Sequence, residues 1–405
     1  MPFKPLHLPW RISAGLAATV VLIAVLALGS FLNAGRQPLR VQGPADLAAT
    51  RFGIIYSLWH CLALNRTQGR PHDIAKAISG QRPWGPVPEF HFWSEPAGGY
   101  YCLADRPDVL RRHAEQLRDA GIDFVIIDAT NNEFADARTP DSPAGIMAPF
   151  RAMLDVWSTV PGAPRIVPWA PLTARGNMLE SLTDLLGGKP DLAFRHDGKP
   201  LALIADNHLF RTDSAKAGRL AQHLTLRPMW GLLRGSEARW SFMEPCESGF
   251  LASGGEQPCN QPAFGRNGVA EQIPIAAAYQ DTFISRKTTA VPKFHGRTLV
   301  RQFETLATHY PGIPIVTIAG WNEWMAQRYC LRGGEAAHTG CTAANDHWPD
   351  GTKVFVDQYD AEYSRDIEPA ATPPGAFYYR LMAACIARYR AGLACNVTDG
   401  DTEMK

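Results

Sequence analysis

Apolar segments alternate with amphipathic segments along most of the chain. Eight short apolar runs predict strands at residues 52–58, 124–127, 165–172, 201–205, 224–233, 240–243, 273–279 and 313–319. Helical spacing of apolar positions predicts helices at residues 106–120, 147–160, 179–186, 216–223, 297–309 and 375–389. Continuous apolar strands that are joined by helices indicate a parallel sheet covered on both faces.

This pattern, in a chain of this length, predicts the α/β class and a (β/α)8 TIM-type barrel. An open doubly wound sheet is the alternative, but no Gly-rich phosphate-binding turn follows a strand. We expect a single barrel with long loops at residues 51–395 and a tail at residues 396–405. The long loops fall at residues 81–103 and 244–272, which are rich in Gly, Pro and aromatic side chains.

The N-terminal segment differs from the rest of the chain. Residues 12–32 form an uncharged apolar run that follows Lys4 and Arg11. About 20 apolar residues suffice to cross a bilayer, whereas a cleaved signal peptide usually has a shorter apolar core. Residues 1–33 therefore predict a signal anchor or a signal peptide, and residues 34–50 a linker. Both alternatives predict export, with the barrel anchored at the inner membrane and facing the periplasm, or secreted.

Cysteine usage agrees with an exported protein. All eight cysteines follow the apolar run, and no CxxC pair is present. Their proximity along the chain suggests the pairs Cys246–Cys259, Cys330–Cys341, Cys385–Cys395 and Cys61–Cys102. The net charge is only +1, so no basic excess argues for nucleic acid. The membrane, through the N-terminal segment, is an expected partner.

Polar and aromatic residues follow the predicted strands, where a barrel builds its active site. They are mainly carboxylates, amides and tryptophans, and no GxSxG elbow or HExxH helix is present. Glycosidic cleavage needs two carboxyl groups, and sugars present flat faces to indole rings. The inventory therefore favours a carbohydrate substrate, with no cofactor and no metal. A metal-dependent hydrolase using Asp128, His60 and Asp206 lacks a supporting spacing signature.

Glu323 is the strongest catalytic candidate, because it directly follows the last apolar run within the sequence WNEW. Indole packing would raise the pKa of its carboxyl, and Asn322 would orient it. Its catalytic partner is expected to be Asp128 or Glu244, although Asp128 could instead cap a turn and Glu244 could be a solvated loop residue. The candidate substrate-binding residues are Trp59, His60, Trp93, Glu95, Asn131, Trp169, Trp321 and Asn322. Core packing is the alternative for the tryptophans and for His60.

The acidic stretch at residues 355–369, FVDQYDAEYSRDIEP, is a further feature near the C-terminus. A calcium loop is conceivable there, but the spacing is not that of an EF-hand. A solvated acidic face, or carboxylates paired with Arg365, is the favoured interpretation.

Several of these segments resemble a known group of proteins. The WNEW motif, Trp59-His60, residues 90–110, GIDFVIIDATN and the acidic stretch are similar to a bacterial branch of the glycoside hydrolase family 99 and 71-like barrels. That group acts on α-linked mannans and glucans. In family 99 the motif continues Asn-Glu-Trp-x-Glu, and its two glutamates are taken as base and acid. The resemblance assigns Glu323 to the first role, but Ala326 stands at the second.

Two functions follow from these observations. The first is an endo-acting glycoside hydrolase of an extracellular or periplasmic polysaccharide, which uses Glu323 with a second carboxyl group. The second is a non-catalytic polysaccharide-binding barrel that serves envelope or exopolysaccharide assembly. A second carboxyl group within about 10 Å of Glu323 distinguishes the two, because the hydrolytic mechanism needs an acid.

Overall fold

The computed structural model describes residues 46–135, 144–207, 209–231, 239–243, 262–265, 268–280, 283–285, 290–357 and 359–396. All of them belong to one structural unit, Val41–Lys405. Within these ranges, no helix combines the length and the apolar character that a membrane span requires. The membrane or signal segment predicted at residues 1–33 lies outside the described residues.

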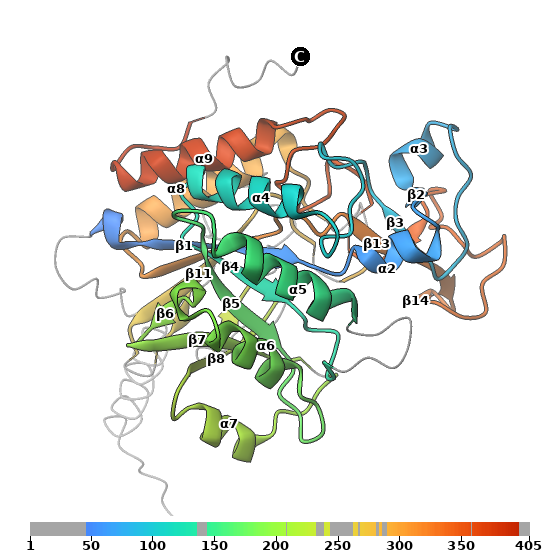
Figure 1. The fold of residues 1–405 in the computed structure, drawn as a ribbon. Helices are drawn as coiled ribbons and strands as arrows, with labels where there is room; N and C mark the ends of the chain where they lie inside the picture. The colour runs from blue at the N-terminus through green and yellow to red at the C-terminus, as the bar shows by residue number, and fades with distance from the viewer. Residues whose placement is uncertain are drawn as a thin grey trace, which may run out of the picture. The chain divides into compact units, whose positions relative to one another are not determined.

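Eight parallel strands form the central sheet, as the sequence predicts. They pair side by side in the order β11-β12-β1-β4-β5-β7-β8-β9 (Figure 1). Their bounds are β1 (Arg51–Ser57), β4 (Phe124–Asp128), β5 (Arg165–Ala170), β7 (Lys199–Ala205), β8 (Thr225–Trp230), β9 (Trp240–Ser241), β11 (Ala270–Ala276) and β12 (Ile315–Ala319). Two short antiparallel strands, β6 (Arg195–His196) and β10 (Ala263–Phe264), pair with β7 and β11.

Side-chain hydrogen bonds join the two ends of this sheet. The Ser241 N–H of β9 donates to Gln272 Oε1 of β11 at 3.1 Å, and Gln272 Nε2 donates to the Ser241 carbonyl at 2.7 Å. The same amide nitrogen donates to Thr317 Oγ1 of β12 at 2.6 Å. The buried Gln272 amide thus takes the place of a backbone ladder between β9 and β11, and the sheet closes into the predicted barrel.

The interior of the barrel is a packed core, and this confines a substrate site to the ends of the strands. Large apolar side chains from alternating strand positions fill it, including Phe124, Trp169, Leu203 and Met229. Gly53 of β1 is required beside them, because a Cβ at that position would collide with the Phe124 ring.

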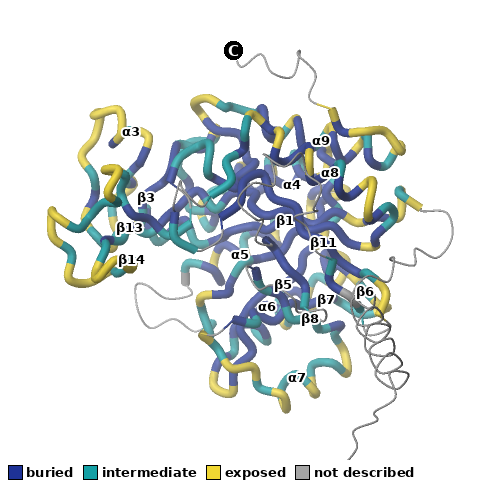
Figure 2. The backbone as a smooth tube through the Cα atoms, turned by 180° about the vertical axis from the view of Figure 1, so that it is seen from behind, coloured by how far each residue is buried: buried dark blue, intermediate teal, exposed yellow. Residues whose placement is uncertain are grey.

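Helices cover the outside of the barrel (Figure 1). Helix α4 shows why they form: Pro107 occupies its first turn, and its buried residues Val109, Leu110, Ala114 and Leu117 keep helical spacing. The outward surfaces of the helices and their connecting turns carry most of the exposed positions (Figure 2). The larger helices are α4 (Pro107–Asp119), α5 (Ala144–Trp157), α6 (Met178–Gly187), α7 (Ser214–Leu220), α8 (Arg297–His309) and α9 (Phe377–Arg390).

A second, smaller sheet stands beside the barrel, beyond the carboxyl end of β1 (Figure 1). No apolar run in the sequence predicts this sheet. Its order is β14-β13-β3-β2, and β15 also pairs with β13. The strands are β2 (His72–Asp73), β3 (Phe90–Phe92), β13 (Met325–Arg332), β14 (Glu335–Ala337) and β15 (Val354–Phe355). Strand β13 begins two residues after Glu323. The second sheet therefore fixes the segment that directly follows this candidate catalytic residue.

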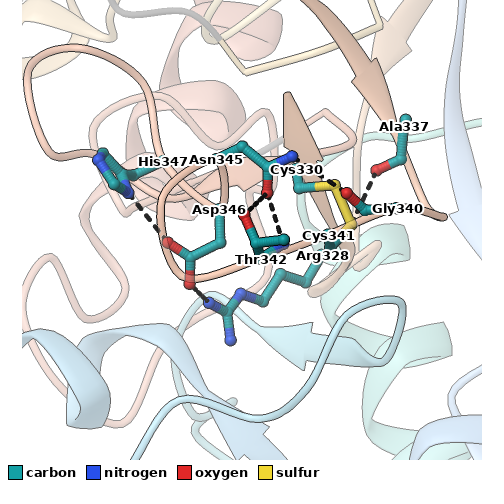
Figure 3. The surroundings of a disulfide bond; sticks show 9 residues. All are labelled: Arg328, Cys330, Ala337, Gly340, Cys341, Thr342, Asn345, Asp346 and His347. Atoms are coloured by element: carbon teal, nitrogen blue, oxygen red, sulfur yellow. Dashed lines mark hydrogen bonds and ion pairs between the residues drawn. A yellow bond between two sulfur atoms is a disulfide. The ribbon is translucent and has the colours of Figure 1, made fainter. Parts of the chain in front are cut away.

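Three of the four predicted disulfides lie within the described residues and are confirmed: Cys61–Cys102, Cys330–Cys341 and Cys385–Cys395. The predicted Cys246–Cys259 pair lies outside the described residues. The Cys330–Cys341 bond joins β13 to the segment after β14 (Figure 3). Nearby, Arg328 of β13 forms an ion pair with Asp346 at 2.6 Å, so the outer part of the second sheet is fixed both covalently and electrostatically.

Candidate active site

The candidate site forms at the carboxyl end of the barrel, around the side chain of Arg365. Arg365 Nη2 lies 3.2 Å from Glu323 Oε2 and 3.3 Å from Asp357 Oδ1. Because both oxygens contact one nitrogen, they lie at most 6.5 Å apart, the sum of those two distances. The side chains of Glu323 and Asp357 are each 16% exposed, so both are largely buried but still reach the surface.

The barrel strands and the acidic stretch bring these groups together. Glu323 follows β12, while Gln280 follows β11 and donates from Nε2 to Asp357 Oδ1 at 2.9 Å. The acidic stretch packs closely against the end of β12, because Gly320 has a φ of +97° and no side chain. A Cβ on Gly320 would lie 2.9 Å from the carbonyl oxygen of Arg365.

Asp366 fixes the backbone on which Glu323 stands. Its carboxylate accepts hydrogen bonds from the N–H of Glu323 at 2.6 Å, the N–H of Trp324 at 2.9 Å and the indole of Trp93 at 2.7 Å. Trp324 adopts a left-handed φ of +46°, and its ring stacks on Trp93 at 4.6 Å between centroids. In the sequence WNEW, Glu323 alone is not fully buried, so this turn sends Trp324 into the core and leaves Glu323 at the surface of the site.

Asn322 and His60 hold the same loop from the side of β1. The Asn322 amide accepts from the Ser57 N–H at 2.8 Å and donates to the Ser57 carbonyl at 3.1 Å. His60 Nε2 donates to the Asn322 carbonyl at 2.6 Å, and burial lowers the pKa of His60 to about 4. Both residues are fully buried, and their contacts in the structure hold the loop that carries Glu323, whereas contact with a substrate was predicted for them.

The carboxyl groups of the site hold their protons more tightly than surface carboxyls. Burial, and then the negative charge of Asp357, raise the pKa of Glu323 well above its usual range, and Arg365 offsets this only in part. Burial also raises the pKa values of Asp357, Asp128 and Asp366. An excess of buried carboxyls over cations favours a protonated carboxyl at a pH where an exposed one is ionised. The site can therefore supply an acid.

Asp128 ends β4 as predicted. Its surroundings bear on both interpretations of this residue, as a turn cap and as a catalytic partner of Glu323. Its Oδ1 accepts hydrogen bonds from the N–H of Thr130 at 3.0 Å and from the Thr130 hydroxyl at 2.8 Å, which is the turn-capping arrangement. Its charge also raises the pKa of Glu323, so Asp128 belongs to the same electrostatic cluster. Glu244 lies outside the described residues.

Four tryptophans were candidates for stacking on sugars, and the structure separates them. Trp93, Trp169 and Trp321 are 2%, 2% and 0% exposed, so their rings pack in the core and offer no face to a substrate. Trp59 is half-buried beside Phe90. Of the remaining polar candidates, Glu95 forms an ion pair with Lys76 at 2.7 Å, and Asn131 is exposed in the turn after β4.

One group among the described residues has ligand atoms close enough for a metal ion, and it lies at the opposite end of the barrel. The ligand atoms of His196, Asp197 and Glu271 all lie within 4.8 Å of one another. Arg227 donates to Glu271 at 2.6 Å and to Asp197 at 2.7 Å, so a guanidinium already fills the position of a cation. This group is an ion-pair network that runs from the buried Glu271 to the exposed Asp197 at the amino ends of the strands, where barrels build stability.

Asp357 and Arg365 are the site residues that sequence reasoning did not assign. The favoured interpretation of the acidic stretch, carboxylates paired with Arg365, is confirmed for Asp357. That interpretation stopped at the stretch itself and did not connect it with Glu323. The available signal was that both WNEW and the acidic stretch belong to the segments that carry the family resemblance.

Comparisons with known proteins give similarity to solved structures. No protein-family model and no curated protein matches the chain. Among solved structures, the chain is similar to the family 99 endo-α-mannosidase of Bacteroides thetaiotaomicron in complex with bis-tris propane, with a TM-score of 0.46 and 13% identity. The similarity covers 84% of this chain and 98% of that one. A similarity of this degree does not establish a family for the chain.

Proposed function

We propose that the protein is a glycoside hydrolase that cleaves a polysaccharide with Glu323 and Asp357 as its two carboxyl groups. One observation carries the proposal: at the carboxyl end of a barrel, one oxygen of each carboxyl group contacts the same Arg365 nitrogen, so these two oxygens lie at most 6.5 Å apart. Carboxyl pairs about 5–5.5 Å apart support direct attack on the anomeric carbon, whereas about 6.5–9.5 Å leaves room for an attacking water. Because Arg365 holds the two carboxyl groups this close together, we propose direct attack by one of them.

The surroundings of the two carboxyls suggest how the roles divide. Hydrogen bonds from Arg365 and Gln280 favour the ionised form of Asp357, against the burial that raises its pKa. Glu323 has its pKa raised well above the usual range by burial and by the charge of Asp357. Environments that separate two carboxyl groups in this way assign an acid and a nucleophile. Glu323 is then the acid, which differs from the base or nucleophile expected from the family resemblance.

In the proposed reaction, Glu323 donates its proton to the glycosidic oxygen while a carboxylate oxygen of Asp357 bonds to the anomeric carbon. The bond to the leaving sugar breaks, and that sugar departs with the proton. Glu323, now ionised, accepts a proton from water, and the resulting hydroxide displaces Asp357 from the anomeric carbon. Arg365 lies between the two carboxyls and stabilises whichever of them is ionised.

The test is cleavage of oligosaccharides of α-linked mannose and α-linked glucose, four to eight units long. Cleavage is measured as the release of reducing ends. Glu323→Gln and Asp357→Ala should each lower kcat by about a thousandfold or more, because each removes a group that acts in the transition state. Glu304→Gln, an exposed glutamate of α8, is the control and should retain wild-type activity.

Azide separates the two roles. As an external nucleophile, it should restore bond cleavage in Asp357→Ala and leave a glycosyl azide of inverted configuration. Full activity in either carboxyl variant would remove that residue from the mechanism. A wild type that binds these glycans but cleaves none of them would favour the non-catalytic binding protein instead.

We also propose that the protein acts outside the cytoplasm. The confirmed disulfides support this location, because such bonds persist in oxidising compartments. The apolar run at residues 12–32 supplies a means of export.

A further inference from the structure

Two half-buried aromatic pairs lie at the carboxyl ends of barrel strands. Trp59, which follows β1, meets Phe90 with 5.4 Å between ring centroids. Trp230, the last residue of β8, meets Phe283 at 5.7 Å. All four residues retain solvent exposure, in contrast to the fully buried tryptophans of the core.

The pair Trp59–Phe90 includes a residue of the loop after β1, which is bonded to the loop that carries Glu323. Trp59 stands close in the chain to Ser57 and His60, and both of these bond to Asn322. Asn322 directly precedes Glu323, so the loop that carries Trp59 is tied to the loop that carries Glu323.

The pair Trp230–Phe283 lies next to Asp357. The N–H of Asp357 donates to the Phe283 carbonyl at 2.8 Å, and the neighbouring residues Ile284 and Val356 form an antiparallel bridge. The Trp230 ring also packs over Trp169 and Phe242, at 5.8 Å and 5.9 Å, so it covers the top of the barrel core.

The order of the strands places these two pairs on opposite sides of the barrel. Between β1 and β8 lie β4, β5 and β7 in one direction, and β12, β11 and β9 in the other. Strands β1 and β8 are therefore opposite members of the ring of eight. The loop of Glu323 is bonded to the loop of Trp59, the backbone of Asp357 is bonded to Phe283, and Arg365 joins the two carboxyls.

We infer that an extended saccharide chain crosses the barrel mouth, with one sugar ring stacked at Trp59–Phe90 and another at Trp230–Phe283. This inference rests on the proposed function and deepens it, because sugars held on both sides of the carboxyl pair place the scissile bond inside a chain. Cleavage is then internal. The carboxyl-rich centre disfavours anionic sugars, so a polysaccharide without acidic groups is the substrate class that fits this site.

The test measures how binding depends on chain length. In the Glu323→Gln background, which blocks turnover, calorimetry gives Kd values for neutral α-linked mannose and α-linked glucose oligosaccharides of two to eight units. Trp230→Ala should weaken binding of the longest chains by about tenfold and leave the disaccharide within about twofold, since only long chains reach both pairs. Trp59→Ala should behave alike, and Trp230→Phe, which keeps a ring, should recover most of the affinity.

The control is Tyr379→Ala, which removes a half-buried aromatic ring from α9 on the outside of the barrel. It should leave the Kd unchanged at every chain length. A purely structural role of Trp230 would lower affinity equally for short and long chains, and that result would overturn the inference.

Two outcomes keep this inference distinct from the proposed function. Wild-type cleavage of long chains, combined with unchanged Kd and KM in Trp230→Ala, would refute the aromatic site and leave the hydrolase intact. A wild type that neither binds nor cleaves any of these oligosaccharides would refute the proposed function, and the inference with it.

Discussion

Replacing Glu323 by Gln should stabilise the folded protein at pH 8, and the gain should be larger there than at pH 5. The reason is the raised pKa of Glu323, which burial and the charge of Asp357 cause. A group that binds its proton more tightly in the folded state lowers the free energy of unfolding as the pH rises from the unfolded pKa towards the folded one. Glutamine has the same shape, keeps an oxygen for Arg365 and carries no proton to lose.

The size of the effect follows from linkage. Each pH unit over which Glu323 stays protonated in the folded state but ionised in the unfolded state costs about 1.4 kcal/mol. An unfolded glutamate, with a pKa of about 4.3, is largely ionised at pH 5. Between pH 5 and pH 8 the advantage of the variant can therefore grow by at most about 4 kcal/mol. Taking the difference between the two pH values cancels any constant effect of the substitution on packing.

The assay is equilibrium unfolding in urea at pH 5 and pH 8, for the wild type and two variants. Glu271→Gln is the matched control, because Glu271 is also largely buried but has the opposite pKa shift. Burial alone would raise the pKa of Glu271, yet bonds from Arg227, His196 and Trp240 hold it well below its usual range. That variant should lose about 1–3 kcal/mol equally at both pH values, since Glu271 is ionised throughout. An advantage of Glu323→Gln that stays constant or shrinks with pH would refute the reasoning.

Two further predictions concern His60 and the N-terminal segment. Burial lowers the pKa of His60 to about 4, so the protein should lose about 3 kcal/mol of stability from this residue as the pH falls from 6.5 to 4, and His60→Gln should make that part of the acid unfolding curve flatter. Identical curves for the variant and the wild type would contradict this. A reporter that is active only outside the cytoplasm, fused after residue 60, should be active, whereas activity of a cytoplasmic reporter alone would show that the chain is not exported.

The barrel could be predicted because its signals are local. Most central strands contain a short apolar run, such as Phe124–Asp128, and helices such as α4 keep the spacing that buries one face. The second sheet lacked such signals. Strands β2, β3 and β15 have only two or three residues, and β13 alternates between buried and partly exposed positions without an apolar run. These strands form because segments far apart in the chain pair with one another. The spacing of apolar residues along the sequence does not predict such pairing.

The same limit applies to the site. Glu323 became a candidate because it directly follows a predicted strand and stands between two tryptophans. Asp357 did not, because 34 positions separate it from Glu323, and only the fold places both on Arg365. The sequence also could not predict which tryptophans are buried. Trp59 and Trp169 both come at or near strand ends, yet one is half-buried at the mouth and the other packs in the core.

The position of Asp357 bears on why Ala326 is tolerated in a hydrolase of the proposed kind. The motif of family 99 has a second glutamate where this chain has Ala326, which is 1% exposed within β13. The chain that brings in Asp357 runs along the same strand, because the N–H of Val356 donates to the carbonyl of Gln327 at 2.9 Å. Asp357 therefore enters the site beside the position that lacks a carboxyl. A buried glutamate at position 326 would add one more negative charge to a cluster whose pKa values are already raised, and this would cost free energy unless the cluster bound a further proton. Asp357, from the segment paired with β13, supplies the second carboxyl group that the proposed hydrolysis needs. No additional charge at position 326 is then required.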